Sequence, residues 1–388
     1  MIKIEHKKDC CGCEACAQSC PTNCISMRED NEGFIYPSVE IKSCIDCGLC
    51  EKVCPVINQS ESHEPIKVYA ARNIDEQIRK QSTSGGLFTS LAQNTIQNGG
   101  VVFGAKFNSQ WEVVHIGASN IEELAALRGS KYSQSRIGDT FNEVKAYLKK
   151  NREVLFCGTP CQIAALRLHI GSDDTKLTTI DFICHGTPSP KVWRQYLNNI
   201  ADTSTISAIN FRDKKRSWND YNISIVANNK TIIDQKATQN LFMQGFFNDL
   251  FLRPACHHCP AKSGKSGSDI TLGDFWGIER VAPKFNDNKG VNLLIVNTPK
   301  GVETIQKIKL NTIEVDYPTA IQWNPSANNS TPTPVSREKF FTAIDTDMIG
   351  ELQRLVYVPI SRQIEITIKR AICSLLPYWL VDRLQRKK

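Results

Sequence analysis

Two cysteine runs near the N-terminus have the types and spacing needed for iron–sulfur chemistry. Each follows the pattern C-x2-C-x2-C-x3-C-P, at residues 10–21 and again at residues 44–55. In this pattern three thiolates of a run bind one 4Fe-4S cluster, and the fourth, next to the proline, binds the other cluster. The predicted ligands are Cys10, Cys13, Cys16 and Cys54 for the first cluster, and Cys44, Cys47, Cys50 and Cys20 for the second. We therefore expect the chain to transfer single electrons.

Disulfides and zinc are the alternative uses of these cysteines. The first ten residues, MIKIEHKKDC, lack the apolar segment of a signal peptide, so the 16 cysteines of the chain indicate a reducing cytoplasm. The doubled run is also tighter and more regular than the usual zinc spacings. Cys11 and Cys24 break the pattern, and we expect them to be small buried residues beside the clusters.

Five further cysteines lie in the middle of the chain, mostly at predicted turns. Cys161 follows Pro160 at the start of a predicted helix, where free N–H groups and the helix dipole stabilise a thiolate. Their spacing leaves open a third iron–sulfur cluster, a zinc site, scattered buried thiols, or a redox-active C-x2-C pair. The five are Cys157, Cys161, Cys184, Cys256 and Cys259, the last two separated by His257 and His258.

Two short polar segments are candidate binding loops. Ser82-Thr-Ser-Gly-Gly86 precedes a predicted helix, where backbone N–H groups and hydroxyls can approach a phosphate. Hydroxyl residues at this position are also ordinary helix N-caps. The segment 128–132 has the same ambiguity, since Lys131 could meet a phosphate or a flavin ring, or be a solvated loop charge.

The length of 388 residues predicts two or three domains. Residues 58–65 are polar, end in proline and have no apolar periodicity, which is typical of a linker. We predict a two-cluster ferredoxin domain at residues 1–57, a linker at 58–65, a core at 66–335 and a C-terminal basic amphipathic tail at 336–388.

The core pattern predicts strands that alternate with helices. Strand, glycine-proline turn and helix follow one another twice, at residues 154–170 and 179–200, which favours an α/β sheet with some parallel pairs. Later strands are separated by loops as much as by helices, so the fold class is mixed α/β or α+β, with a mixed sheet. No segment reaches the ~18 apolar residues of a membrane-spanning helix. The other expected strands are 67–72, 101–107, 206–211, 222–226, 269–272 and 293–296, with a helix from Leu87.

The net charge of +7 is concentrated in the tail. Residues 361–388 hold seven Lys and Arg against two Asp and Glu, whereas residues 1–60 hold six against nine. The acidity of the N-terminal module disfavours nucleic acid as a partner. The tail mixes these cations with apolar residues and fits either an anionic membrane surface or packing on the core, and Pro377 interrupts any long amphipathic helix.

Taken together, the unusual sequence motifs of the chain resemble those of the family of coenzyme F420 hydrogenase/dehydrogenase beta subunits, in the form with an N-terminal ferredoxin domain. They occur in order and reach to about residue 301. The matching stretches are STSGGLF (82–88), RGSKYSQS (128–135), FCGTPCQ (156–162), DFICHGTPSPKVW (181–193), FRDK (211–214), RPACHHC (253–259), SDITLGDFWGI (268–278) and VNLLIVNTPKG (291–301).

The resemblance implies a flavin-binding core, with FAD as the flavin, and one further 4Fe-4S cluster. It implies Cys161, Cys184, Cys256 and Cys259 as ligands of that cluster, with Cys157 as the spare. It assigns the flavin phosphates to Ser84, Gly85 and Gly86 and places Lys131 at the flavin or substrate face. The resemblance leaves two roles for Asp274, Phe275 and Trp276: packing in the core or contact with the cofactor. A proton donor should accompany the flavin, and Lys131 and His185 are the candidates.

The expected function is that of an iron–sulfur flavoenzyme. A flavin exchanges hydride with an organic molecule and passes single electrons to clusters. The alternatives are a non-catalytic electron-transfer subunit of a larger complex and a zinc-bearing structural protein. The expected partners are a ferredoxin or another oxidoreductase subunit and a small organic substrate, without nucleic acid. The expected location is cytoplasmic, with membrane-surface contact through 361–388 as an option.

Overall fold

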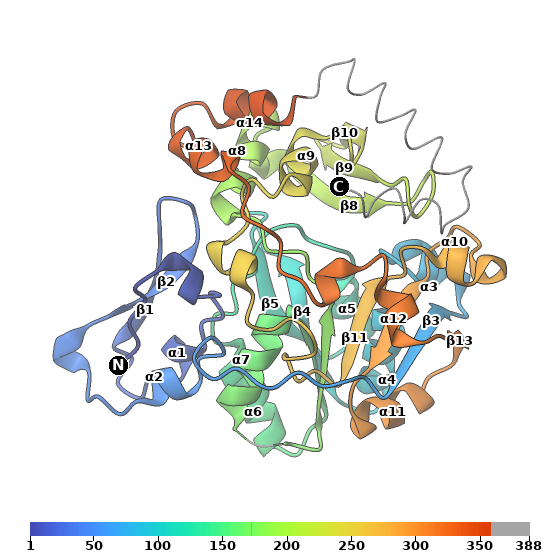
Figure 1. The fold of residues 1–388 in the computed structure, drawn as a ribbon, viewed down its shortest axis with the longest axis horizontal. Coiled ribbons are helices and arrows are strands. Elements are labelled where there is room, and N and C mark those ends of the chain that lie inside the picture. The colour runs from blue at the N-terminus through green and yellow to red at the C-terminus, as the bar shows by residue number, and fades with distance from the viewer. Residues whose placement is uncertain (172, 358–388) are drawn as a thin grey trace.

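The computed structural model describes residues 1–171 and 173–357 of the chain. Within these residues there are three sheets, of two, three and eight strands. Figure 1 shows the N-terminal module to one side, the eight-stranded sheet with its helices beside it, and the three-stranded sheet above. No helix in the described ranges has both the length and the apolar character required to cross a bilayer.

The N-terminal module is built around its cysteine runs. A hairpin of β1 (Ile25–Glu29) and β2 (Ile35–Val39) separates two short helices, α1 (Ala15–Gln18) and α2 (Leu49–Lys52), one in each run. From there residues 58–65 run along the core without regular structure, and the Ser62 hydroxyl donates a hydrogen bond to the Ser263 carbonyl at 2.5 Å. The predicted linker segment is therefore laid against the core.

The large sheet is mixed, as expected from the sequence. Its order is β13-β3-β12-β11-β7-β6-β4-β5, and the four strands β11, β7, β6 and β4 pair in parallel while both flanks pair antiparallel. The bounds are β3 Lys67–Asn73, β4 Val101–Phe107, β5 Val113–Ala118, β6 Val154–Gly158, β7 Leu177–Phe182, β11 Ile270–Asp274, β12 Asn292–Val296 and β13 Leu310–Glu314.

The helices that follow the parallel strands start at the predicted turns. At the start of α7, Thr159 and Gln162 form a capping box, Pro160 takes the first helical position, and the helix ends at Gly171 with φ of +76°. The helices around the large sheet are α3 Glu76–Gln81, α4 Leu87–Gln97, α5 Ile121–Leu127, α6 Thr140–Lys149, α7 Pro160–Ile170, α10 Ile278–Val281, α11 Pro299–Gln306 and α12 Tyr317–Ile321.

The small sheet differs from the expectation of a single mixed sheet. The predicted strands 206–211 and 222–226 form β8 (Ile206–Asp213) and β9 (Asn222–Ala227), which pair antiparallel with each other and with β10 (Lys230–Lys236). They stay separate because they bury their own aromatic core, which includes Trp193, Phe211, Phe242, Phe251 and Phe340.

Residues 336–356 belong to this second core. They were expected in the C-terminal tail, but they form α13 (Ser336–Thr342) and α14 (Met348–Val356), which pack with α8 (Pro190–Ile200) and α9 (Leu241–Phe247). Phe340 and Leu352 are fully buried there. The basic segment 361–388 lies outside the described residues.

Candidate redox site

The N-terminal thiols gather in two groups that follow the predicted exchange of the fourth cysteine. Burial raises the pKa of Cys16 to about 12, and the neighbouring thiols of Cys10 and Cys54 add to the shift. Cys13 is close to Cys16 and Cys10 as well. The other group, Cys20, Cys44, Cys47 and Cys50, lines one small cavity at the far end of the module. Cys20 thus lies near the second run, and Cys54 lies near Cys10 and Cys16 as well as near Cys50 of its own run.

The two cysteines outside the pattern are buried, as expected, but each lies against a thiol of the site. The Cys24 sulfur is 3.3 Å from that of Cys20 and lines the same small cavity. Cys11 lies between Cys13 and Cys161, and its hydrogen bond with Cys161, together with burial, raises the pKa of that thiol. Cys11 therefore marks where the N-terminal module meets the core.

Four core thiols converge from three places in the chain. Cys161 begins α7, Cys184 follows β7, and Cys256 and Cys259 lie in and just after the 3-10 turn Pro254–His258. Burial raises the pKa of Cys184, and the thiols of the other three act on it in the same direction. Cys157 is elsewhere: burial raises its pKa to about 12, and its charged neighbours are Asp181 and Lys131.

Two buried cations flank the four core thiols. The Arg253 side chain, from a residue only 1% exposed, reaches Cys10 and acts on Cys256, and Lys262 donates hydrogen bonds to the carbonyls of Cys184 and Ser326. Within residues 1–171 and 173–357, no three His, Cys, Asp or Glu side chains are grouped to hold a single metal ion.

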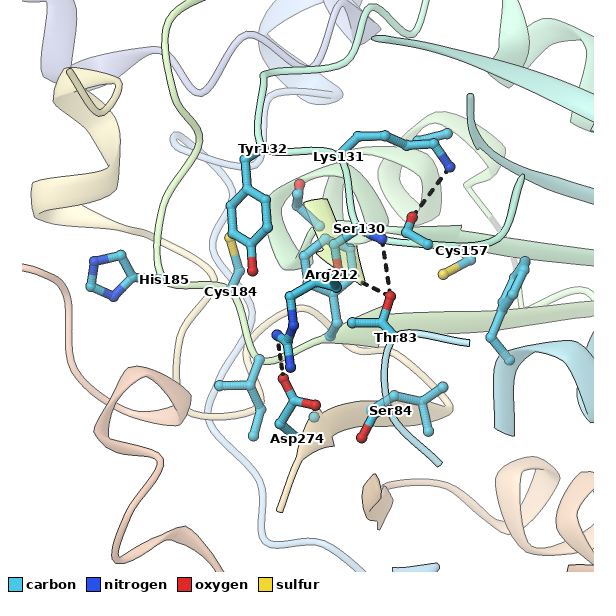
Figure 2. Close-up of a pocket in the computed structure, with 18 of the residues that line it drawn as sticks. Thr83, Ser84, Ser130, Lys131, Tyr132, Cys157, Cys184, His185, Arg212 and Asp274 are labelled. Carbon is cyan, nitrogen blue, oxygen red and sulfur yellow. Dashed lines mark hydrogen bonds and ion pairs between the residues drawn. The ribbon is translucent and has the colours of Figure 1, made fainter. Parts of the chain in front are cut away.

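A cavity of about 590 Å³ lies beside these thiols. Its floor is formed by the carboxyl ends of β6, β7 and β11, and its cover by Arg212 of β8 and Tyr221, which directly precedes β9. Crevices at the carboxyl ends of parallel strands are common binding sites in α/β proteins. Figure 2 shows its labelled residues: Thr83, Ser84, Ser130, Lys131, Tyr132, Cys157, Cys184, His185, Arg212 and Asp274.

The predicted flavin-phosphate residues divide between this cavity and the sheet behind it. Ser84 and Gly86 line the cavity, and the Ser84 hydroxyl donates to the Val291 carbonyl at 3.0 Å. Gly85 does not line it: a Cβ on this residue would lie 2.8 Å from the Ala71 carbonyl oxygen. Gly85 thus lets the loop approach the sheet closely.

The two predicted proton donors lie at different parts of the cavity. The Lys131 amine donates to the carbonyls of Ala126, Arg128 and Gly129 at 3.1, 2.8 and 3.2 Å, and burial lowers its pKa to about 7. The His185 ring is hydrogen-bonded to Asp249 at 2.5 Å, and its side chain is 39% exposed. Lys131 is the more enclosed of the two.

Sequence reasoning missed Arg212, which covers the cavity. Its Nη1 donates to Asp274 at 2.9 Å, and its guanidinium lies 3.9 Å from the ring centre of Tyr221. Its Nε and Nη2 are buried without a hydrogen bond to any described residue, and the Tyr132 hydroxyl faces the group (Figure 2). Phe275, which was left open above, is fully buried, whereas Asp274 and Trp276 line the cavity.

Two more buried side chains on the cavity wall each have one polar atom without a hydrogen bond among the described residues: His115 bonds the Cys157 carbonyl through Nε2, and Asp181 accepts from Ser266 through Oδ2. Burial lowers the pKa of His115 to about 4, and its Nδ1 has no hydrogen bond within the described chain. Burial raises the pKa of Asp181 to about 6, and its Oδ1 is equally unpartnered there. Because buried polar groups in proteins are nearly always hydrogen-bonded, these two atoms are exceptions among the described residues.

The fold and the grouped thiols define an iron–sulfur redox protein. The model for the N-terminal part of the coenzyme F420 hydrogenase/dehydrogenase beta subunit matches residues 68–141, and the model for its C terminus matches residues 151–320. A 4Fe-4S dicluster domain matches residues 9–58. The chain belongs to the family of coenzyme F420 hydrogenase/dehydrogenase beta subunits, in the form that carries an N-terminal dicluster ferredoxin domain.

Individual relatives match parts of the chain. A component of the F420H2 dehydrogenase of Methanosarcina mazei is 25% identical over 174 residues, covering 42% of this chain and 49% of the relative. A protein of Methanocaldococcus jannaschii is 26% identical over 202 residues, covering 43% and 54%. The chain thus spans about half the length of these two relatives.

One further relative is similar to the N-terminal module, and one solved structure overlaps part of the chain. A 7Fe ferredoxin of Hydrogenibacillus schlegelii is 41% identical over 64 residues, covering 16% of this chain and 76% of the ferredoxin. A chain of the F420-reducing [NiFe] hydrogenase complex of Methanosarcina barkeri superposes with a TM-score of 0.47 at 15% identity, covering 76% of this chain and 92% of that one.

Proposed function

We propose that the protein is an iron–sulfur flavoprotein oxidoreductase. Electrons pass between the two N-terminal clusters, a third 4Fe-4S cluster on the four core thiols, and a flavin, FAD, in the cavity. The observation that carries the proposal is the position of Cys184, which belongs to the core thiol group and also lines the cavity. A group bound in the cavity would therefore lie next to the core cluster.

The residues around the core thiols fit a negatively charged cluster. Arg253 and Lys262 are buried, and neither forms an ion pair with a carboxylate in the described parts of the chain. A buried charge without a counter-charge is strongly destabilising. Four thiolates around an iron–sulfur core would supply the missing negative charge to both cations.

The cavity fits a flavin in size and in its unmatched polar groups. Its volume of about 590 Å³ lies in the range typical of cofactor and ligand pockets. Ser84 and Gly86 would contact the flavin, and Arg212, which also lines the cavity, has two nitrogens, Nε and Nη2, without a hydrogen bond in the described residues. A bound flavin supplies hydride exchange on one side and single-electron exchange on the other.

Lys131 is the proton-transfer residue that the geometry favours over His185. An amine with a pKa of about 7 both gives and accepts a proton near neutral pH, which suits general acid–base catalysis. Lys131 also lines the cavity, close enough to Cys157 for the two charges to interact. His185 is hydrogen-bonded to Asp249, and its side chain is 39% exposed.

The alternative function is a non-catalytic electron-transfer subunit of a larger complex. The relative in Methanosarcina mazei is named as a subunit of a dehydrogenase. The outer end of the N-terminal module also exposes Cys47 together with Ile41 (71% exposed) and Ile45 (64% exposed). Apolar side chains around an accessible ligand thiol suit docking of a ferredoxin or another oxidoreductase subunit.

Anaerobic purification with iron, zinc and flavin analysis tests the proposal. We expect about 12 iron atoms and one flavin per chain. Cys259→Ser should lose about four irons, whereas Cys157→Ser, as the matched control, should lose none. About eight irons with bound zinc would reject the core cluster, and three clusters without any flavin would favour the electron-transfer subunit.

The cellular setting is part of the same proposal. The cysteine-rich composition supports a cytoplasmic location, where thiolates stay reduced. Liposome flotation of the full chain and of a chain lacking residues 361–388 would test membrane contact. Flotation that depends on those residues supports it, and flotation that is absent or unchanged rejects it.

A further inference from the structure

Arg253 crosses from the core into the loop of the first cysteine run. Its Nε donates to the Cys10 carbonyl at 2.6 Å, and its Nη2 lies 3.5 Å from the Cys10 sulfur. The same Nη2 donates to the Ile35 carbonyl at 2.9 Å, and Nη1 donates to Gln134 at 2.9 Å. One side chain from the core therefore holds both the cysteine loop and the hairpin of the N-terminal module.

The loop is shaped to receive this side chain. Gly12 has φ of +70°, and a Cβ there would lie 2.5 Å from Arg253 Nη1. Gln134 in turn donates to the Cys11 carbonyl at 2.9 Å, and the Cys11 thiol is in contact with Cys161. Thus the loop that carries Cys10 and Cys13 is fastened directly beside the core thiols.

The charge of Arg253 lies between two thiol groups. On one side it acts on Cys10 and Cys11, and on the other on Cys256, only three residues along the chain. The guanidinium also contacts the rings of Tyr36 at 4.5 Å and Phe34 at 5.4 Å. Among described residues its partners are carbonyl, amide, thiol and aromatic groups, without a carboxylate.

We propose that Arg253 is a positioning residue that joins the first N-terminal cluster to the core and sets the reduction potential of that cluster. Hydrogen bonds to ligand sulfurs and nearby positive charge favour the reduced, more negative state of a cluster. The Cys10, Cys13, Cys16 and Cys54 cluster is then the one that exchanges electrons with the core, and the Cys20 cluster is the outer one. This inference rests on the proposed function only where it takes Cys256 as a core ligand.

The test is an EPR-monitored redox titration of the anaerobically purified full chain. Arg253→Met removes the charge and the N–H···S contact, so the midpoint potential of one N-terminal cluster should become more negative while the other is unchanged. Arg253→Lys keeps the charge and should give a smaller shift. It also serves as the second variant if Arg253→Met fails to fold.

Arg337 provides a matched control. This buried arginine also joins the core to the N-terminal module, through Glu32 at 2.6 Å and the Leu252 carbonyl at 3.0 Å, and none of its hydrogen bonds goes to a thiol. Arg337→Lys should leave all potentials unchanged. Unchanged potentials in both Arg253 variants, or equal shifts in the Arg337 variant, would overturn the proposal. An iron content of about eight would reject the core cluster separately, without changing the expected effect on the Cys10 cluster.

Discussion

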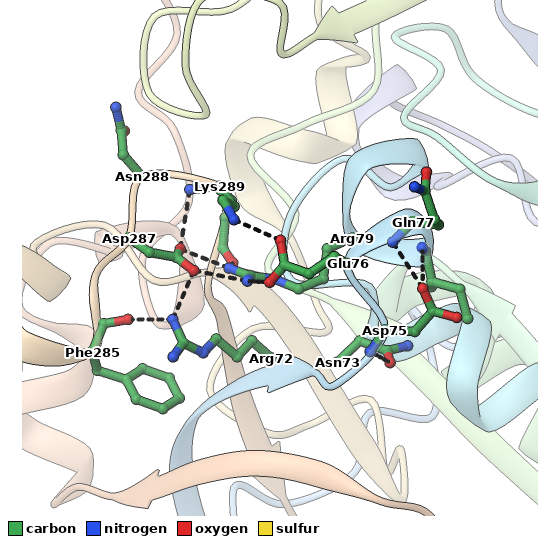
Figure 3. Close-up of polar contacts among 12 residues, drawn as sticks. Arg72, Asn73, Asp75, Glu76, Gln77, Arg79, Phe285, Asp287, Asn288 and Lys289 are labelled. Carbon is green, nitrogen blue, oxygen red and sulfur yellow. Dashed lines mark hydrogen bonds and ion pairs between the residues drawn. The ribbon is translucent and has the colours of Figure 1, made fainter.

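Replacing Asp287 by asparagine probes how the rim of the cavity is held in place. Asp287 receives two hydrogen bonds from Arg79, Nη1 to Oδ2 at 2.8 Å and Nη2 to Oδ1 at 2.7 Å, and a third from Arg72 at 2.9 Å (Figure 3). Arg79 is buried in the last turn of α3, shortly before the Ser82–Gly86 segment. The Lys214 amine donates hydrogen bonds to the backbone carbonyls of both Arg79 and Ser84. The ion pair between Arg79 and Asp287 therefore holds in place the Ser82–Gly86 loop that lines the cavity.

The expected loss follows from the burial of the two partners. Removing one member of a buried ion pair costs about 3–5 kcal/mol, since the other charge stays buried. The Asp287 side chain is 31% exposed, and Glu76 still accepts from Arg79 at 2.8 Å, so part of the charge remains matched. We expect Asp287→Asn to lower the free energy of unfolding by about 2–3 kcal/mol.

The assay is anaerobic urea unfolding followed by tryptophan fluorescence, compared among the wild type, Asp287→Asn and Glu76→Gln. Glu76 is 56% exposed, so its loss should cost less than about 1 kcal/mol. A cost for Asp287→Asn within about 0.5 kcal/mol of zero, or one no larger than that of Glu76→Gln, would refute the reasoning.

The pH dependence gives an independent check on the same pair. Burial alone would raise the pKa of Asp287, but the hydrogen bonds and charge of Arg79 outweigh it and lower the pKa to about 2. A lowered carboxyl pKa contributes stability above the unfolded value of about 3.9, and that contribution is lost as the pH falls toward 2. The difference between wild type and Asp287→Asn should therefore be constant from pH 8 to about 5 and shrink only in stronger acid.

Two further predictions concern the cavity. Arg212→Gln should weaken binding of an anionic group by about tenfold or more, because a bidentate charged contact would be lost. A lower flavin-to-protein ratio would identify the flavin phosphate as the bound anion, and a raised KM with flavin retained would identify the substrate. No change in either quantity would contradict a role of Arg212 in anion binding. Lys131, with a pKa of about 7, is protonated below neutral pH, so substrate reduction should slow as the pH rises through 7. The Lys131→Met variant should lose this inflection in the pH–rate profile. An inflection that persists in the variant would exclude Lys131 as its source.

The parts that sequence predicts well are those determined by local spacing. The spacing of the cysteine runs predicts which thiols lie near one another, and the Gly-Thr-Pro turns before α7 and α8 indicate both the strand end and the helix start. Pro160 also explains why Cys161, at the start of the helix, joins the core thiols, whereas Cys157 stays at the strand end and faces the cavity.

The cavity wall could not be predicted in this way, because its residues come from distant strands. Arg212 and Asp274 are 62 positions apart and meet only because the small sheet folds over the large one. A single arginine in β8 or a single histidine in β5 gives no periodic signal of what it faces. The Ser82–Gly86 motif is recognisable in the sequence. Its local pattern does not reveal that Gly85 packs on β3 and β12 instead of lining the cavity.

The thiols and much of the cavity cover lie in different parts of the fold. The thiols lie in the N-terminal module and on loops of the large sheet, whereas Arg212 of β8, Tyr221 directly before β9 and Phe246 of α9 supply much of the cover of the cavity. The aromatic core beneath the small sheet includes Phe34 of the N-terminal module and packs against Cys256, so substitutions in that core would reach the thiol groups. Directed evolution aimed at substrate preference should therefore vary the polar side chains that line the cavity and leave unchanged the aromatic residues behind them, which reach Cys256.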